Sequence, residues 1–174
     1  AEWLYQIPGE FDKEAEGPDT FLAPTENVKV LNTPVSEEEI RSLDVGDVVL
    51  INGTIFTGRD AVHKYLHEGG ELDIFNGGII YHCGPVVLKK ESGYEVMAAG
   101  PTTSIREEPY EAGVIDKFGV KAVIGKGGMG AKTLKACEDS GAVYLHAIGG
   151  AAQVYALAIK EVPSVSLEQF GSPE

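Results

Sequence analysis

The sequence predicts an α/β domain whose first half is rich in strands and whose second half forms a parallel sheet. Short apolar runs separated by glycine, proline and asparagine turns fill the first half. From residue 94 onward, three apolar runs each lead through a glycine-containing loop into a helical segment. Repeated strand–loop–helix units are typical of parallel strands, because each helix carries the chain back to the start of the next strand.

The length and composition favour one domain preceded by an extended arm. A chain of 174 residues with 43% hydrophobic residues and 22 glycines can bury a real core and is rich in tight turns. Residues 1–26 contain prolines, many acidic residues and little periodicity, so we expect an arm that packs on the domain or on a partner. Residues 27–174 are expected to fold as a single domain.

Local patterns predict the elements of the first half. Ser36 and Glu39 form a capping box, which indicates the start of a short helix. The apolar runs 47–51 and 54–56 flank an Asn-Gly pair, which is a strong signal for an antiparallel hairpin. Further strands or helices are expected at residues 28–31, 60–68, 77–82 and 86–89.

In the second half, each predicted strand is followed by a predicted helix. The strands are expected at residues 94–99, 119–125 and 141–148, and the helices at 107–118, 131–139 and 151–160. The last two units echo each other, since each strand ends in paired glycines that open a helix. Ligands of parallel sheets bind at the carboxyl ends of the strands, so we expect the three loops to meet there.

Residues 100–106, Gly-Pro-Thr-Thr-Ser-Ile-Arg, combine a sharp turn with a run of hydroxyls. The proline cannot continue a strand ladder, and Thr102, Thr103 and Ser104 are good helix N-cap residues. Unpaired backbone N–H groups at such a turn would form a cradle for an anion, and Arg106 offers a planar fork suited to a carboxylate. The alternative is an ordinary capped turn with a surface arginine.

The charge of the chain argues against a nucleic-acid surface, because the formal net charge is −13. An anion site must therefore be built locally, and Arg59 lies beside a glycine turn at the start of an expected helix. A cation there opposes the positive end of the helix dipole, and a bound anion would remove that conflict. Lys126 lies among the glycines of residues 125–130, whose spacing is not that of a Walker loop. The alternatives are a partly exposed arginine and a solvated loop lysine.

Nothing in the sequence indicates a membrane segment or a secretion signal. Apolar runs fall short of the ~20 residues that a membrane span needs. The first residues lack a basic region followed by an apolar one. We therefore expect a cytoplasmic protein with no membrane and no nucleic-acid partner.

Three segments together carry a family resemblance: residues 58–64 (Gly-Arg-Asp-Ala-Val-His-Lys), residues 100–106, and residues 125–129 (Gly-Lys-Gly-Gly-Met). The chain resembles the β region of the iron–sulfur-dependent hydro-lyases, the class I fumarase and L-tartrate dehydratase family, over roughly residues 27 to 164. The resemblance implies a swivelling β/β/α domain. One departure is that two glutamates follow Arg106, where members of the family commonly have methionine.

The resemblance implies the β subunit of a hydro-lyase that reversibly adds water to a four-carbon unsaturated dicarboxylate, such as fumarate to malate. One iron of a 4Fe–4S cluster would act as a Lewis acid on the leaving hydroxyl. Arg59, Arg106 and Lys126 would clamp carboxylates, and Thr103 would orient the turn or contact substrate. Thr102, near the proton that moves, and Lys126 are the catalytic candidates.

The cysteine count indicates where that cluster is held. Cys83 and Cys137 are the two cysteines of the chain, and an iron–sulfur cluster usually takes three or four. We interpret both as buried or idle thiols, so that this chain has no metal ligands of its own. The cluster would then belong to a partner, the cluster-bearing α subunit, in a dimer of heterodimers.

Several alternatives stay open at the level of sequence. The chain could be the β subunit of an L-tartrate dehydratase, or a non-catalytic subunit for small-anion binding or assembly. His63, one turn beyond Arg59, could steady that arginine or the substrate, although a histidine on a helix face is more often structural. His82 and His146 are expected to be structural and His67 to be exposed.

Overall fold

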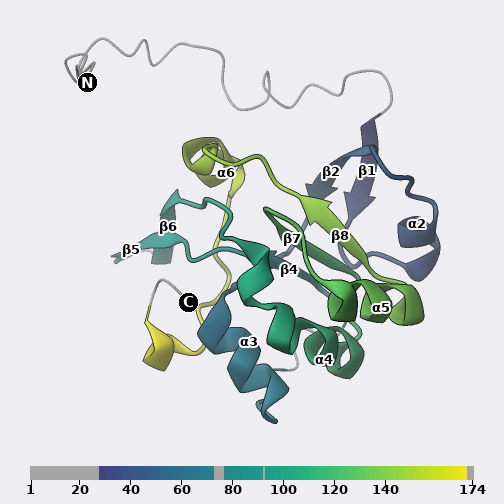
Figure 1. Cartoon of the computed structure of the whole chain (residues 1–174). Helices are drawn as coiled ribbons and strands as arrows, with labels where there is room; N and C mark the ends of the chain where they lie inside the picture. The colour runs from purple at the N-terminus through teal and green to yellow at the C-terminus, as the bar shows by residue number, and fades with distance from the viewer. Residues whose placement is uncertain (1–27, 73–76, 92, 172–174) are drawn as a thin grey trace, which may run out of the picture.

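The computed structural model describes residues 28–72, 77–91 and 93–171, and the arm expected at residues 1–26 lies outside them. This part of the chain contains both helices and strands (Figure 1). In order they are β1 (Val28–Asn32), α2 (Glu37–Arg41), β2 (Val48–Asn52), β3 (Phe56–Gly58), α3 (Asp60–His67), β4 (Ile79–His82), β5 (Val86–Lys90), β6 (Gly93–Ala98), η2 (Ser104–Arg106), α4 (Glu108–Phe118), β7 (Ala122–Gly125), α5 (Ala131–Ser140), β8 (Val143–His146), α6 (Ala152–Ala158) and η3 (Glu168–Phe170).

Four parallel strands form the central sheet in the order β3, β4, β7, β8. Across it, Ile80 of β4 pairs with Phe56 of β3, and Val123 of β7 pairs with both Ile80 and Tyr144 of β8. Two smaller sheets accompany it, a parallel β1–β2 pair and an antiparallel β5–β6 pair. The expected α/β fold with parallel and antiparallel strands is therefore confirmed.

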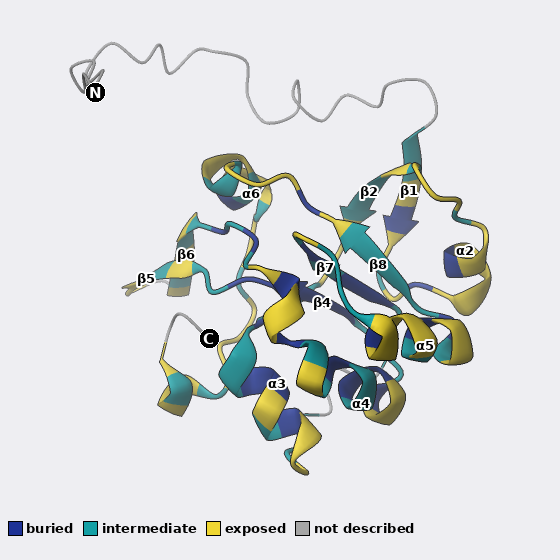
Figure 2. Ribbon diagram, viewed as in Figure 1, coloured by how far each residue is buried: buried dark blue, intermediate teal, exposed yellow. Residues whose placement is uncertain are grey.

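The two faces of the central sheet pack against different layers, because successive side chains of a strand point to opposite sides. Ile80 packs with Leu66 of α3 in a cluster that also takes in α4 and α5. The preceding Ile79 packs instead with Leu31 of β1 and Ile40 of α2. The middle strands β4 and β7 are accordingly the most deeply buried (Figure 2). The result is a β/β/α arrangement with α3, α4 and α5 on one face (Figure 1).

The antiparallel hairpin predicted around Asn52-Gly53 is wrong. β2 pairs in parallel with β1, and β3 joins the central sheet beside β4. Gly53 has a φ of +99°, and a Cβ there would lie 2.3 Å from Thr33 Oγ1. The glycine therefore allows the chain to pass close to Thr33 while it crosses from the small sheet to the central one.

The strand that leads into the Gly-Pro-Thr-Thr-Ser turn also lies outside the parallel sheet, contrary to prediction. β6 instead pairs antiparallel with β5. Exposed and half-buried residues alternate along β6, so one face of this strand, which includes Glu95, lies toward solvent. A central parallel strand is covered on both faces and reads as a continuous apolar run, as β4 does.

The predicted capping box is confirmed, and the predicted ends of α4 and α5 agree with the structure to within one residue. Ser36 and Glu39 form both bonds of a capping box at the start of α2. Gly119 ends α4 and Gly141 ends α5, both in the left-handed conformation that glycine adopts at low cost. Among the described helices, none is long and apolar enough to cross a membrane.

A candidate anion site at the carboxyl edge of the sheet

The turn that follows β6 lies across the carboxyl ends of β4 and β7. The Thr102 amide donates to the His82 carbonyl over 2.7 Å, and the Ser104 amide donates to the Lys126 carbonyl over 3.0 Å. Thr103 forms an isolated parallel bridge with Lys126. The turn thus reaches the expected edge although its strand is not part of the sheet. For these two amides the predicted cradle of unpaired N–H groups is wrong, because the sheet already uses them.

The predicted helix capping by these hydroxyls is also wrong. Thr103 precedes the short helix η2 and makes no side-chain cap hydrogen bond, and neither does Glu107 before α4. The three residues of η2 separate the hydroxyls from α4, so they stand a turn too early to cap it. Thr102 is half-buried and Thr103 is exposed. The Ser104 hydroxyl is buried against His82, with Oγ 2.9 Å from Nδ1.

Arg106 reaches the residue that follows Arg59, at the corner between β3 and α3. Arg59 is the residue that precedes α3, and its half-buried guanidinium acts electrostatically on Cys83. Arg106 comes from the far turn, and its Nε donates to Asp60 Oδ2 over 2.9 Å while Nη2 contacts the same oxygen. Asp60 is a partner that the sequence did not predict. It holds Arg106 next to Arg59 and leaves 53% of the Arg106 side chain exposed.

Lys126 stands where two glycine-rich loops meet. It follows Gly125 at the end of β7, and Gly127 and Gly128 after it have φ values of +80° and +83°. Its Cδ lies 4.0 Å from the position that a Cβ on Gly149, in the loop after β8, would occupy. The half-buried Lys126 side chain therefore extends along the edge toward that loop.

The N-terminus of α5, which the glycine loop opens, is occupied by a carboxylate of the same chain. Glu108 accepts from the Gly130 amide over 2.8 Å, from the Lys132 amide over 3.0 Å and from Thr133 Oγ1 over 2.6 Å. A Cβ at Gly130 would lie 2.5 Å from Glu108 Oε1, so glycine is required there. Although burial opposes it, these donors lower the pKa of Glu108. An external anion must therefore be bound by side chains at this edge and not by the α5 terminus.

Behind the edge lies a buried polar cluster of His63, His82 and Glu111, all with fully buried side chains. Glu111 Oε2 lies 2.8 Å from His82 Nε2 and 3.1 Å from His63 Nε2. His63 Nδ1 lies 2.8 Å from the Arg59 carbonyl. The expectation that His82 is structural fits its burial, whereas His67 is exposed as predicted and contacts the Tyr110 ring.

The protonation states of the cluster follow from its contacts. Burial raises the pKa of Glu111, but the charge of His63 and hydrogen bonds from both histidines outweigh it and hold the value at about 2. Burial also works against a charged His63, yet Glu111 and the Arg59 carbonyl raise its pKa. Burial lowers the pKa of His82, and the nearby His63 adds to that effect. The cluster therefore favours an ionised Glu111, and it favours the protonated form at His63 over that at His82.

Two histidines and a glutamate are also a ligand set for a divalent metal, with all ligand atoms within 4.8 Å of one another. A zinc ion at ~2.1 Å from each ligand in tetrahedral geometry would hold those atoms about 3.3 Å apart. His82 Nε2 and Glu111 Oε2 are closer, at 2.8 Å, which is a charge-assisted hydrogen-bond distance. The geometry fits a direct hydrogen bond better than metal ligation.

Glu107 is a second buried carboxyl group, beside the cluster. Neither of its oxygens receives a hydrogen bond from another side chain that the structure describes, and the same holds for Asp60 Oδ1. A proton on Glu107 resolves this, because the protonated acid donates to Asp60. Burial, together with the hydrogen bond and charge of Asp60, raises the pKa of Glu107 to about 7, against the effect of His63.

The two cysteines are buried, as expected, and neither carries an ionised sulfur. Burial raises the pKa of Cys83 to about 12 and that of Cys137 to about 11. They belong to different parts of the fold, the end of β4 and helix α5. Within the described residues, the cysteines therefore do not fit a 4Fe–4S cluster, which binds several thiolates.

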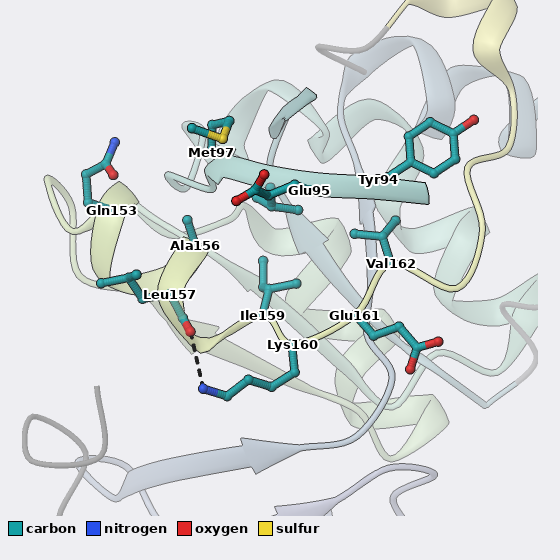
Figure 3. A pocket seen from close by; sticks show the side chains of 11 residues that line it. Tyr94, Glu95, Met97, Gln153, Ala156, Leu157, Ile159, Lys160, Glu161 and Val162 are labelled. Carbon is teal, nitrogen blue, oxygen red and sulfur yellow. Dashed lines mark hydrogen bonds between the residues drawn. The ribbon is translucent and has the colours of Figure 1, made fainter. Parts of the chain in front are cut away.

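Two hollows on the surface lie apart from this edge. One of about 300 Å³ is lined by β6, α6 and the segment that follows it, where Lys160 Nζ reaches the Leu157 carbonyl over 3.5 Å (Figure 3). The other, about 930 Å³, runs between α2 and α5 and includes the exposed Leu134. Neither of these two hollows is lined by Arg59, Thr102, Arg106 or Lys126.

The structure thus brings Arg59, Thr102, Thr103, Arg106 and Lys126 to one edge of the sheet. Sequence reasoning missed the acidic residues that organise them. A signal existed for Glu111, because it lies three and four residues before Val114 and Ile115 and so shares the apolar face of α4. An acidic residue on a buried face requires a buried partner, and histidines at the ends of neighbouring elements were candidates.

The fold and this edge define an α/β domain that gathers cationic side chains at the carboxyl ends of its parallel strands. A family model described as "Fumarase C-terminus" matches residues 3–174. The chain belongs to that family, and the resemblance carried by the three motifs is confirmed.

Two relatives illustrate the range of the family. A protein of Geobacillus stearothermophilus named "Putative fumarate hydratase class I" is 56% identical over 177 residues, which cover 99% of this chain and 34% of that protein. The L(+)-tartrate dehydratase subunit beta of Escherichia coli (strain K12) is 38% identical over 149 residues, 84% of this chain and 74% of the relative. This chain therefore spans about a third of the length of the first relative.

Proposed function

We propose that this chain supplies the substrate-binding and proton-transfer residues of a hydro-lyase that adds water reversibly to fumarate to give malate. The observation that carries the proposal is the convergence of three cationic side chains and the Pro-Thr-Thr turn on one edge, in a member of the fumarase C-terminus family. A four-carbon dicarboxylate carries two negative charges, which this otherwise acidic chain could bind only at such a local group of cations.

In this proposal the cations hold the substrate at its two ends. Arg59 and Arg106, held together by Asp60, would bind one carboxylate, and Lys126 would bind the other. Thr102, between them on the turn, would take or pass the proton of the carbon next to the far carboxylate. A threonine hydroxyl is a poor base at its free pKa, so the neighbouring cations must stabilise its deprotonated form.

The 4Fe–4S cluster of the proposed reaction would be held outside this chain. The buried, protonated thiols of Cys83 and Cys137 support that proposal. The partner would be a cluster-bearing α subunit, with two such pairs forming a dimer of heterodimers, or the remaining part of a longer protein such as the Geobacillus relative. Such a partner would cover the open edge and exclude water from it.

Fumarate is preferred over tartrate because the relative named for fumarate hydratase is 56% identical, whereas the tartrate dehydratase subunit is 38% identical. The second candidate is a β subunit of an L-tartrate dehydratase. It would use the same cations to bind tartrate, which has one more hydroxyl group than malate. A non-catalytic anion-binding subunit would bind dicarboxylates without turnover.

The test is a substrate panel on the chain assembled with its cluster-bearing partner and reconstituted with iron and sulfide. We expect hydration of fumarate with a higher kcat/KM than dehydration of L-tartrate, and loss of both in Lys126→Met. Lys132→Met, an exposed lysine of α5, is the matched control and should keep wild-type kinetics. Preference for tartrate would assign the second candidate, and binding without turnover would assign the third.

A further inference from the structure

A chain of hydrogen bonds, with one ion-pair contact between Glu111 and His63, connects the three loops of the candidate site through the protein interior. It begins at the Gly128 amide, which donates to Tyr144 Oη over 3.2 Å, and Tyr144 Oη lies 3.1 Å from Ser104 Oγ. Ser104 Oγ contacts His82 Nδ1, and from there the chain runs through Glu111 and His63 to the Arg59 carbonyl. We propose that this chain positions the candidate site, with Ser104 and Tyr144 as positioning residues that tie the Lys126 loop to the Arg59 corner.

Each bond of the chain has a direction that its neighbours dictate. A backbone N–H can only donate, so Tyr144 accepts from Gly128 and uses its own O–H toward Ser104. His82 Nε2 faces the Glu111 carboxylate, which can only accept, so a neutral His82 carries its proton on Nε2 and donates to Glu111. Its Nδ1 is then unprotonated and accepts from Ser104 Oγ. One arrangement of protons thus accounts for every hydrogen bond from Gly128 to Glu111 Oε2, while Glu111 Oε1 has no hydrogen-bond partner among the described residues.

The far end of the chain is fixed in the same way. The Arg59 carbonyl can only accept, so His63 Nδ1 carries a proton, and His63 Nε2 faces the Glu111 carboxylate at 3.1 Å. The Arg59 carbonyl also accepts the first backbone hydrogen bond of α3, from the His63 amide over 2.9 Å. The backbone carbonyl of Arg59 thus accepts two hydrogen bonds from one buried histidine, His63.

Close packing at Ser104 indicates that the connection is built into the fold. A Cβ at Gly125 would lie 1.8 Å from Ser104 Oγ and 3.1 Å from His82 Nδ1. Only glycine at the end of β7 allows the serine hydroxyl to reach the histidine. Gly125 is therefore needed for the hydrogen bond between Ser104 and His82. The packing of Gly125 against Ser104 also determines where the following Lys126 lies.

Removal of the Tyr144 hydroxyl should loosen the loop of residues 125–130 without removing a side chain that is proposed to bind the substrate. Tyr144→Phe keeps the half-buried ring, which packs against the core, and deletes only the oxygen between Gly128 and Ser104. Tyr94→Phe is the matched control, because Tyr94 is also half-buried but lies on the β5–β6 hairpin, where its ring contacts Lys89.

The experiment measures hydrogen exchange of the backbone amides of residues 125–130 in the chain assembled with its partner. Loss of a hydrogen bond worth ~1 kcal/mol should make exchange about 5-fold faster in Tyr144→Phe. Exchange in the control Tyr94→Phe should not change. Since Lys126 would bind the substrate equally in ground and transition states, KM for fumarate should rise about 5-fold with kcat within about 2-fold. Exchange and KM equal to those of Tyr94→Phe would overturn the proposal.

A second measurement covers the case in which the variant does not fold. Imidazole ¹⁵N shifts of the wild-type protein at neutral pH should show His82 as the neutral Nε2–H tautomer and His63 protonated on both nitrogens. An Nδ1–H tautomer at His82 would leave Nε2 without a proton to donate to Glu111, break the chain at that link and overturn the proposal. The KM readout rests on the proposed function, whereas exchange and ¹⁵N shifts do not. A wild-type protein that fails to bind fumarate therefore refutes the function alone.

Discussion

Replacement of Glu107 by glutamine should make the protein more resistant to alkaline conditions. Glu107 is fully buried, and it faces Asp60 and His63 of α3 while Arg106 binds the other side of Asp60. Its pKa in the folded state is about 7, against 4.5 for an unperturbed glutamate. A glutamine amide can donate to Asp60 as the protonated acid does, but it has no proton to lose.

The sign and size of the effect follow from linkage. The folded state holds the Glu107 proton more tightly than the unfolded chain does, so its stability falls as the pH rises from about 4.5 to about 7. A shift from 4.5 to about 7 at 1.36 kcal/mol per pKa unit amounts to about 3 kcal/mol at pH 8. For a chain of this length, that corresponds to roughly 6–12 °C in melting temperature.

The assay compares the melting temperatures of wild type and Glu107→Gln at pH 5 and pH 8 by circular dichroism. Comparison of the two proteins cancels the titration of His63, whose raised pKa also favours the folded state at low pH, and that of His82, whose lowered pKa acts in the opposite direction. Glu107→Gln should gain most of its advantage at pH 8 and little at pH 5. Glu138→Gln, at an exposed position of α5, should gain nothing at either pH. An equal change at both pH values would show that Glu107 is already ionised at pH 5.

Three further changes test individual side chains in the assembled enzyme. Arg106→Lys keeps a charge but loses the fork that Asp60 holds, and kcat/KM for fumarate should fall about 10-fold or more, as enzyme kinetics would measure. Thr102→Ala should still bind dicarboxylate but lose roughly 10²–10⁴-fold in kcat, whereas a variant that turns over normally would assign the base to the partner. Glu108→Ala leaves the α5 amides without their acceptor and should cost about 1–2 kcal/mol in urea unfolding, a loss that Lys132→Ala should not reproduce.

Sequence patterns predicted the local parts of this fold well, because local chemistry determines them. The capping box at Ser36 and the left-handed glycine at the end of α4 need only neighbours within a few residues. The pairing of β2 with β1 was missed, since an Asn-Gly pair favours a hairpin only when no tertiary contact competes. Here Gly53 is used for close approach to Thr33.

The cationic residues of the candidate site were predicted because they lie in short motifs beside turns, and the structure gathers them at one edge. Their partners could not be predicted in the same way. Arg106 and Asp60 are 46 residues apart in the chain, and His82 and Glu111 are 29 apart. Such pairs depend on how elements pack, which a motif of seven residues does not encode.

Three glutamates near the start of α4 each interact with a different part of the fold. Glu107 shares a proton with Asp60 at the Arg106 corner, Glu108 caps α5, and Glu111 joins His63 to His82. The three carboxyl groups therefore bind α3, α5 and the end of β4 to one short segment. Because only η2 separates that segment from the Pro-Thr-Thr turn, any shift of α4 would move Thr102 relative to both Arg59 and Lys126. The acidic residues that depart from the expected methionine are thus the ones that fix the geometry of the cations.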